Sequence, residues 1–506
     1  MSNMKNSFSL PYSANRIKLI VSSFFILVFI AGCKDEFLDR QPKGQLTFDT
    51  FFETRDHAIW ATNAVYQNFR SWQMCAFPWI GITDIISDDA DKGSFPNDAL
   101  YVLELDDFTF NSTNTAFREA WEGHYQTIFR ANLAINNIPG IEMDETLKNR
   151  LIGENKFLRA YCYMRLVQWF GDLPLITTIL TSDEYYTQTR TPVAQIYDFI
   201  EQDLLDAINV LPEKSNYPSA DLGRATKGAA EGMLAYLYML KHDFTKAAEY
   251  SESIIQSGEY SLLPRYSDNF LPVGELGAES IFEISAVAAN AAVAGPGATP
   301  YNMIQGVRGV PNLGWGFNRP SDDLVAHYEA GDPRRQATII YEGEVLPDGS
   351  TIVQHNADVL NARYNQKAWV PSHPGLQDNG PGNIRILRYA DILLLAAEAN
   401  NEISNSGKAL EYINLVRARA RGTNNFILPN LTITDQSMLR EEIYAERRVE
   451  LAMEEHRWFD LARWGRIADV MGPLMPNFVA AKHTLLPIPQ SEIDLSGGNI
   501  QQNPGY

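Results

Sequence analysis

Apolar residues at helical spacing run through most of the chain and restrict it to a mainly α-helical fold. From residue 56 to 72, and again from 115 to 138, apolar side chains recur every three to four positions, which is typical of amphipathic helices. The second run stops at Pro139-Gly140, because proline cannot extend a helix and glycine caps it. A wider apolar face runs from Glu154 until Gly171-Asp172 breaks it. These segments predict helices packed against one another.

Two later stretches share one pattern. They are GMLAYLYMLKHDFTKAAEYSESII (232–255) and YADILLLAAEANNEISNSGKALEYINLVRARA (389–420). Both are similar to the large-small-aromatic-small order of a tetratricopeptide helix hairpin, with Ala399 at the aromatic position of the second, and small residues let paired helices approach closely. The matching positions are Leu234, Ala235, Tyr238 and Ala247, then Leu395, Ala396, Ala399 and Ala409. The pattern favours a helical-repeat scaffold over a Rossmann or barrel fold.

The helical pattern fails between Pro264 and Gly382. Proline, glycine and asparagine are dense there, with strand-like runs at Ser280–Ser285 and Ala337–Tyr341. A long irregular segment on a rigid scaffold usually carries binding groups. We therefore expect a ligand-binding site in this segment.

The N-terminus has the layout of a secretory signal. Positive residues precede about a dozen mostly apolar residues, too few to span a bilayer comfortably, and then Ala31-Gly32. Cys33 after Ile-Ala-Gly resembles the bacterial lipobox, whose cysteine receives a diacylglycerol, and two acyl chains suffice for stable anchoring. Asp35-Glu36 is similar to the export signal of surface lipoproteins in the Bacteroidetes. The alternatives are a signal peptide followed by an incidental cysteine, or an uncleaved anchor.

The charge of the chain excludes two classes of partner. The formal net charge is −20, and removal of residues 1–32, with three positive and no negative residues, makes it −23. Such an acidic chain argues against nucleic acid and against docking on anionic lipid. Beyond Cys33, the cysteines Cys75 and Cys162 are interpreted as buried apolar residues.

Five motifs resemble the SusD/RagB family of nutrient-binding surface lipoproteins from Bacteroidetes. They are CKDEFLDRQPKG with FDTFF, FLRAYCYMRLVQWFGDLPL, NIRILRYADILLLAAEA, ERRVELAMEEHRWFDLARWG and LLPIPQSEIDLSGGNIQQNPGY. They span nearly the whole mature chain in the family's order. The resemblance implies a mostly α fold, with tetratricopeptide-like hairpins forming a superhelical base and an irregular region laid upon it. It also implies glycan binding through aromatic side chains and a lid-like partnership with a SusC-like TonB-dependent transporter of the outer membrane.

The resulting layout is a signal peptide (1–32) and a single domain (33–506). In that domain the helical scaffold covers about 50–260 and 384–470, and the irregular ligand-binding region covers about 261–383. Attachment to the cell surface would be through the Cys33 lipid alone.

Several motifs that suggest catalysis or a cofactor have a structural interpretation. In the acidic and basic run from Glu446 to Arg463, charges recur at i to i+3 (Arg447 and Glu450, Glu454 and Arg457, Asp460 and Arg463), as in ion pairs that join helices. None of the eight histidines has a partner at metal-ligand spacing, and HExxH, GxSxG and P-loop motifs are absent from the sequence. The group Asp84, Asp88, Asp89 and Asp91 lacks the glycine and glutamate of an EF-hand, which favours turn and cap roles, although a structural calcium ion stays open.

Two stretches carry the parts of a sugar-binding site. A sugar ring presents an apolar face and a rim of hydroxyls, so its site needs exposed aromatic planes among polar side chains. One stretch is DDADKGSFPNDALY (88–101) and the other is TPYNMIQGVRGVPNLGWGFNRP (299–320). The candidate residues are Phe95, Asn97, Tyr101, Tyr301, Asn302, Trp315, Phe317, Asn318 and Arg319. The alternative for each ring is that it fills the underside of the loops.

The sequence thus predicts a non-enzymatic surface protein that captures an oligosaccharide. One alternative is a helical scaffold that holds a peptide or another nutrient on its concave face. Another is a glycoside hydrolase, which needs two carboxylates about 5 to 10 Å apart beside a cleft.

Overall fold

The computed structural model describes residues 51–287, 297–353, 361–371 and 380–506. Residues Thr54–Tyr506 form one compact unit. Cys33 and the expected signal segment lie outside the described residues, so the lipid anchor and the domain boundary at residue 33 stay predictions. Across the described ranges, every helix is too short or too polar to cross a bilayer.

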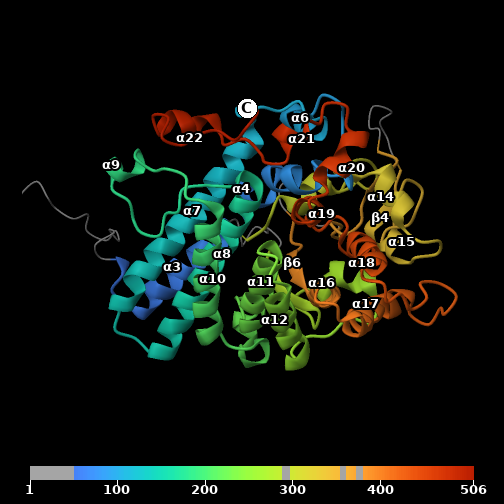
Figure 1. Cartoon of the computed structure of the whole chain (residues 1–506), viewed down its shortest axis with the longest axis horizontal. Helices are drawn as coiled ribbons and strands as arrows, with labels where there is room; N and C mark the ends of the chain where they lie inside the picture. The colour runs from blue at the N-terminus through green and yellow to red at the C-terminus, as the bar shows by residue number, and fades with distance from the viewer. Residues whose placement is uncertain (1–50, 288–296, 354–360, 372–379) are drawn as a thin grey trace, which may run out of the picture. The chain divides into compact units, whose positions relative to one another are not determined.

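Within the described ranges, nine longer helices form the base of the compact unit. Neighbours along the chain pack against each other, as do α12 and α16, and Figure 1 shows the helices succeeding one another from blue to orange. This confirms the predicted mostly helical fold. The helices are α3 (Arg55–Asn68), α7 (Thr115–Asn137), α8 (Glu145–Phe170), α10 (Val193–Val210), α11 (Lys227–Leu240), α12 (Phe244–Ser257), α16 (Tyr389–Glu402), α17 (Ser406–Arg421) and α18 (Gln436–Leu451).

The ends of these helices follow from local chemistry. Asn114 and Asp144 accept hydrogen bonds from backbone N–H groups in the first turns of α7 and α8, which satisfies donors that a helix leaves unpaired. A 3₁₀ turn at Ile138–Gly140 follows α7, and α8 stops at Gly171, whose φ is +71°. Both predicted stops are therefore confirmed.

The two predicted hairpins are also confirmed, as α11–α12 and α16–α17. Their small positions Ala235, Ala247, Ala396, Ala399 and Ala409 are all buried. At Gly232 on α11, a Cβ would lie 2.5 Å from the Leu387 side chain. Close approach of backbone to neighbour is what the small residues allow.

The irregular region contains short elements. Among the residues that the structure describes, three two-stranded antiparallel ladders pair β1 (Ala90–Gly93) with β3 (Phe317–Pro320), β2 (Ser280–Ile284) with β6 (Ile384–Arg388), and β4 (Ile339–Tyr341) with β5 (Arg363–Asn365). The two predicted strand runs are confirmed as β2 and β4. The expectation that helix resumes at residue 384 is wrong by five residues, because β6 first pairs with β2.

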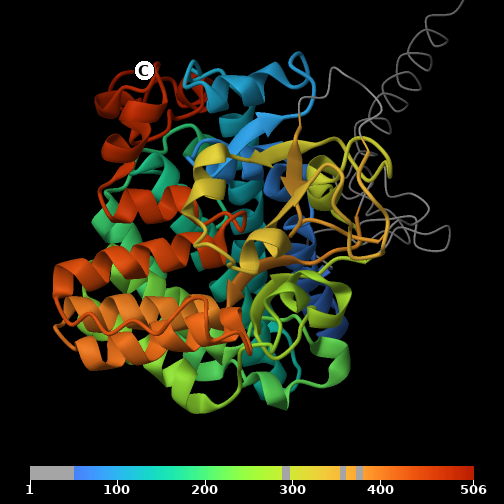
Figure 2. The ribbon, with the colours of Figure 1, turned by 90° about the vertical axis from the view of Figure 1, so that its right-hand side faces the viewer.

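Short helices complete the fold. They are α4 (Trp72–Cys75), α5 (Phe77–Ile80), α6 (Leu100–Asp106), α9 (Ser182–Tyr185), α13 (Tyr301–Gln305), α14 (Asp322–His327), α15 (Arg334–Thr338), α19 (Arg457–Arg463), α20 (Ile467–Leu474), α21 (Ala480–His483) and α22 (Gln490–Leu495). Figure 2 shows the yellow-to-orange irregular segment beside the blue segment that holds β1 and α6. A separate small apolar cluster, which includes Leu313, Ile340 and Tyr364, lies under the irregular loops.

The charged run near α18 forms a buried ion-pair network, as the structural interpretation predicts, but with different partners. The pair Asp460–Arg463 is present at 2.9 Å. Arg447 instead pairs with Asp391 and Asp460, and Glu450 pairs with arginines far along the chain. The predicted ion pairs that join helices are therefore confirmed, although Arg447 and Glu450, and likewise Glu454 and Arg457, pair with charges on neighbouring elements and not with each other. The other network pairs join Glu450 to Arg334, Arg388 and Arg419, Glu454 to Lys367 and Arg388, and Arg457 to Asp88.

The predicted turn and cap roles of the aspartates near β1 are also wrong. Asp88 and Asp89 form ion pairs with Arg448, and Asp91 pairs with Arg319. Asp84 accepts hydrogen bonds from the Glu455 backbone and the Asn318 side chain. Within the described ranges, no cluster of three or more acidic, histidine or cysteine side chains is suited to a metal ion.

The interpretation of Cys75 and Cys162 as buried apolar residues is confirmed. Both are free thiols with 0% exposure. Burial raises the pKa of each thiol, which keeps it protonated and unreactive.

Candidate functional site

The ladder between β1 and β3 brings the two predicted sugar-binding stretches together. Gly93 on β1 lies opposite Phe317 on β3. Gly93 and Gly316 both have positive φ, +69° and +76°, a conformation that favours glycine. A Cβ on Gly93 would lie 2.5 Å from the Gly316 carbonyl oxygen, so the two backbones meet only because a side chain is missing here.

Hydrogen bonds hold the loop that carries Trp315 in place. The Trp315 N–H donates to the Met303 carbonyl at 2.8 Å, and the Gly316 N–H donates to the Gly306 carbonyl at 2.9 Å. The Asn361 amide donates to the Gly316 carbonyl at 2.6 Å and accepts from the Ser94 N–H at 3.1 Å. The position of the indole is therefore fixed before any ligand arrives.

Four rings form one surface, here called the aromatic platform: Trp72, Phe77, Tyr101 and Trp315. The buried Phe77 ring lies at its centre, with ring centroids 5.6 Å from Trp72, 6.1 Å from Tyr101 and 6.1 Å from Trp315. The Trp72 and Trp315 centroids are 6.3 Å apart. Trp315 is 36% exposed, and Trp72 and Tyr101 are half-buried. Flat apolar rings with partial exposure suit one face of a sugar ring.

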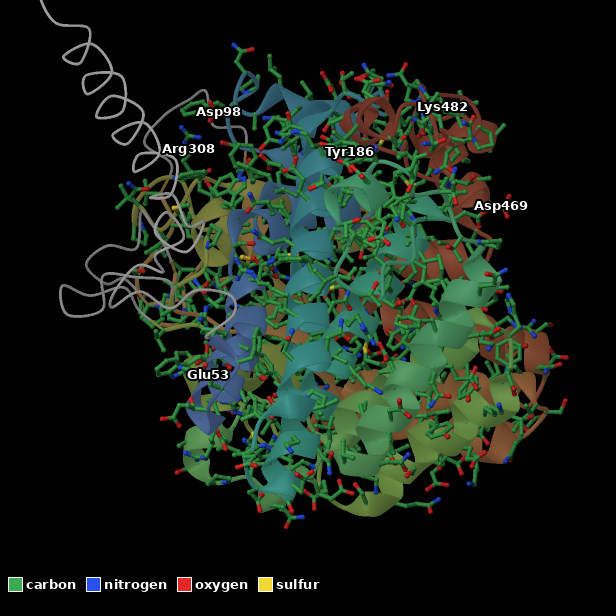
Figure 3. All side chains as sticks on the ribbon, turned by 90° about the vertical axis from the view of Figure 1, so that its left-hand side faces the viewer. Glu53, Asp98, Tyr186, Arg308, Asp469 and Lys482 are labelled. Atoms are coloured by element: carbon green, nitrogen blue, oxygen red, sulfur yellow. The ribbon has the colours of Figure 1, made fainter. Side chains whose placement is uncertain are left out.

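Charged and amide groups border the platform at the 93–98 loop. The Arg308 guanidinium pairs with Asp98 and lies 3.9 Å from the centroid of the Phe95 ring. It also donates to the Ser94 hydroxyl at 2.6 Å. Asn97 is exposed beside this group, and Figure 3 shows Asp98 and Arg308 next to each other at one edge of the molecule. These groups supply hydrogen bonds for the rim of a sugar.

The buried ammonium of Lys92 fixes the same loop from within. It donates to the carbonyls of Gly93, Phe95 and Asp98 at 3.1, 2.7 and 3.0 Å. Burial lowers the pKa of Lys92, although the neighbouring Asp98 acts in the opposite direction. Three carbonyls on one cation hold the loop in a single shape.

A carboxylate lies on another side of the platform. Glu119 of α7 lies near the Trp72 side chain, and its charge adds to the burial that raises the pKa of Tyr101. Partial burial raises the pKa of Glu119, and the nearby Arg118 lowers it in part. The platform therefore has an acidic group near Trp72 and an arginine near Trp315.

The structure separates the nine predicted site residues into two groups. Phe95, Asn97, Tyr101, Trp315 and Arg319 reach the surface, and Arg319 is occupied by its ion pair with Asp91. The expectation that the other four present their side chains to a ligand is wrong. They are Tyr301, Asn302, Phe317 and Asn318, which are at most 6% exposed.

Each buried residue has a structural partner instead. Tyr301 lies near the Glu455 carboxylate, and burial together with the charge of Glu455 raises the Tyr301 pKa well above its usual value. Asn302 bridges the Ala368 carbonyl and the Gly382 N–H at 3.1 Å each. Phe317 packs on Phe77 at 4.5 Å. These side chains support the platform from below, which was the alternative for the rings.

Sequence reasoning missed Trp72, Phe77, Arg308 and Glu119. Trp72 and Phe77 belong to four-residue helices, too short to give a periodic pattern. A signal was available in the aromatic spacing of WQMCAFPW (72–79) next to a predicted helix end. Arg308 stands between glycine and valine in an irregular stretch, where nothing marks its partner Asp98.

A helical-repeat base that carries an open aromatic surface with a polar rim is the architecture of a ligand-capturing protein. The comparison with protein families gives two matches that together cover most of the chain. Residues 278–506 match the SusD family, and residues 36–239 match the family described as starch-binding associating with outer membrane. The chain belongs to the SusD/RagB family, which confirms the resemblance seen in the motifs.

Relatives support the assignment over their full length. SusD-like protein P2 of Formosa agariphila is 30% identical over 521 residues, covering 97% of this chain and 100% of the relative. A solved laminarin-binding SusD-like protein is 28% identical with a TM-score of 0.77, covering 90% of this chain and 100% of its own. Surface glycan-binding protein A from Bacteroides thetaiotaomicron, solved with laminarihexaose, is 25% identical with a TM-score of 0.76, covering 89% and 99%.

Proposed function

We propose that this protein binds an oligosaccharide on the aromatic platform at the cell surface and passes it to a SusC-like TonB-dependent transporter. The observation that carries the proposal is the partly exposed pair Trp72 and Trp315, in which Trp315 is held by a fixed loop and bordered by Arg308 and Asp98. Such a surface stacks on sugar C–H groups while the rim exchanges hydrogen bonds with hydroxyls. The related proteins that bind laminarin and laminarihexaose support a glucan as the first ligand class to test.

The protein is proposed to release its cargo unchanged. The carboxylates beside the platform have cationic partners, Asp98 in Arg308 and Glu119 in Arg118 at 3.9 Å. A glycosidase would instead need one carboxyl to give a proton and the other to attack or activate water. The names of the relatives, which describe binding, support the same proposal.

Replacement of Trp315 tests the site. Trp315→Ala removes the largest exposed plane, so we expect the binding free energy for laminarihexaose to weaken by roughly 1 to 3 kcal/mol. Calorimetric titration against laminarihexaose and a panel of other oligosaccharides measures this, with melting temperature as the fold check. The matched control is Trp60→Ala, another half-exposed tryptophan, on α3. Normal binding by Trp315→Ala together with a lower melting temperature would show the ring to be core.

The lipid anchor has its own test. Cys33→Ala is expected to give an unprocessed or soluble protein instead of one that fractionates with membranes. Radioactive palmitate that still labels the variant would contradict the proposed role of Cys33.

A further inference from the structure

A second concave surface lies apart from the platform, here called the α7–α22 groove. Its walls come from α7, from residues 174–188 with α9, and from α22, and it encloses about 350 Å³. Figure 1 shows α9 and α22 at the same end of α7. Binding pockets for small ligands or side chains begin at about 300 Å³.

Exposed apolar side chains gather at this groove. Phe129 and Tyr185 are each 48% exposed and Leu495 is 43% exposed, and all three line the groove. Tyr186, next in the chain, is also exposed and in Figure 3 lies well away from Asp98 and Arg308. A contiguous exposed apolar patch on a folded protein marks an interaction site. Contact of these apolar side chains with water is unfavourable, and a bound partner that covered them would remove that contact.

Hydrogen bonds hold the groove open. The Tyr125 hydroxyl donates to the Pro174 carbonyl at 2.7 Å, and Asn132 donates to the Ile176 carbonyl at 2.9 Å. The Asn499 amide, beyond α22, donates to the Tyr186 carbonyl at 3.2 Å. The three walls are thus tied together without a ligand, which reduces the entropy lost on binding.

Two carboxylates give the groove its charge. Glu122 and Glu492 both line it. Burial raises the pKa of Glu492, and the charge of Glu122 raises it further. Glu122 has Arg118 at 3.1 Å, whereas no ion pair to Glu492 is found across the described ranges. A cation that entered here would relieve the repulsion between the two acids.

We propose that the α7–α22 groove binds a segment of a partner protein that carries a lysine or arginine beside apolar side chains. The aliphatic walls at Ile176, Leu180 and Leu495 fit leucine-like side chains better than the hydroxyl-rich rim of a sugar. The Glu492 carboxylate, for which the described ranges show no ion pair, fits the cation, and the faces of Phe129 and Tyr185 add cation–π attraction. None of the four platform rings lines this groove, so neither proposal rests on the other.

The test is a selection of random twelve-residue peptides displayed on phage, carried out on the purified full chain. The expected consensus has a basic residue next to apolar residues. A synthetic peptide of that consensus should bind Leu495→Ser and Glu492→Gln each about tenfold more weakly than the unchanged protein. Laminarihexaose affinity and melting temperature should stay unchanged in both variants, and Trp315→Ala should bind the peptide normally.

The charge requirement is tested with a second peptide in which norleucine replaces the lysine. This peptide should bind the unchanged protein about tenfold more weakly than the lysine peptide does. Its affinity should not fall further in the Glu492→Gln variant, because the cation and the carboxylate act as a pair. A selection without consensus, a neutral or acidic consensus, or a peptide that binds the groove variants normally would each overturn the proposal. An oligosaccharide whose affinity falls with Leu495→Ser but not with Trp315→Ala would assign the groove to glycan instead.

Discussion

The network around α18 and the aromatic platform use opposite chemistry. In the network, charged side chains such as Arg334, Arg447 and Glu450 are fully buried and paired. On the platform, Trp72, Tyr101 and Trp315 are partly exposed, and Trp315 lies on a glycine-rich loop. The acidic, basic and histidine side chains of the network thus have a structural role. The loop that carries the proposed binding site contains no catalytic motif. A cluster of reactive residue types is therefore poor evidence for a site until its partners are known.

The largest test of this difference removes one cation from the network. Arg447→Ala leaves Asp391 and Asp460 as buried charges without their shared guanidinium. We expect the free energy of unfolding to fall by about 3 to 5 kcal/mol, because removing one partner strands the other. Urea unfolding measures it, and laminarihexaose titration at a temperature where the variant is folded should give normal affinity.

The matched control is Arg466→Ala, whose pair with Glu441 is half-exposed. Loss of this ion pair should lower the free energy of unfolding by at most about 1 kcal/mol. If Arg447→Ala melted normally while glycan binding disappeared, the network would belong to the site and the comparison would fail.

The network and the residues beneath the platform should change protein stability in opposite directions when the pH changes. Burial alone would raise the pKa of Asp460, but the charges of Arg447 and Arg463 outweigh it and lower the pKa to about 2. Because the unfolded chain takes up the proton first, near pH 4, the Asp460 contribution of about 2 kcal/mol is lost as pH falls from 4 to 2. The stability gap between the unchanged protein and Asp460→Asn should close over this range in urea titrations.

Asp84, beneath the platform, should act in the opposite direction. Burial raises its pKa to about 7 despite the hydrogen bond from Asn318. The folded state therefore holds the proton that the unfolded chain releases, and the unchanged protein loses stability as pH rises from about 4 to 7. Asp84→Asn should lack this decline. If the difference in stability between Asp84→Asn and the unchanged protein stayed constant from pH 4 to 7, the assignment of the raised pKa to Asp84 would be wrong.

The fold could be predicted because residues that are close together in the sequence determine where a helix forms and ends. The stop at Pro139-Gly140 and the small positions of the two hairpins are properties of neighbouring residues, and the structure follows them. The pairing of Glu450 with Arg388 and Arg419 could not be predicted, since these arginines lie on other elements. Spacing along one helix shows only which side chains share a face.

The site could be predicted in part for the same reason. The stretches 88–101 and 299–320 stand out by composition, yet exposure depends on what packs over each ring. Tyr301 and Trp315 share a loop region and an aromatic side chain, and only Trp315 reaches solvent. The partner ring Trp72 comes from a helix more than 200 residues earlier in the sequence. Contacts of this kind are set by tertiary packing.

The loop junction offers a smaller test. Gly93→Ala places a Cβ against the Gly316 carbonyl, at positive φ, and should displace the loop that holds Trp315. We expect laminarihexaose affinity to fall about tenfold, or about 1.4 kcal/mol. Gly343→Ala is the matched control, because Gly343 also has positive φ but open space around it. An equal loss of affinity in both variants would show that the junction does not position the platform.

The smallest expected effect is the coupling between Trp72 and Trp315. Their centroids are 6.3 Å apart and tilted by 50°, so one sugar unit that spans both would be held by two planes at once. Single and double alanine variants in calorimetric titrations give the interaction free energy, which we expect to be about 0.5 to 1.5 kcal/mol. Melting temperatures of the same four proteins separate ring packing from ligand contact, because coupling in stability without ligand belongs to the rings alone. Additive losses in binding would mean that each ring contacts a different sugar unit, and the platform would then be two adjoining subsites.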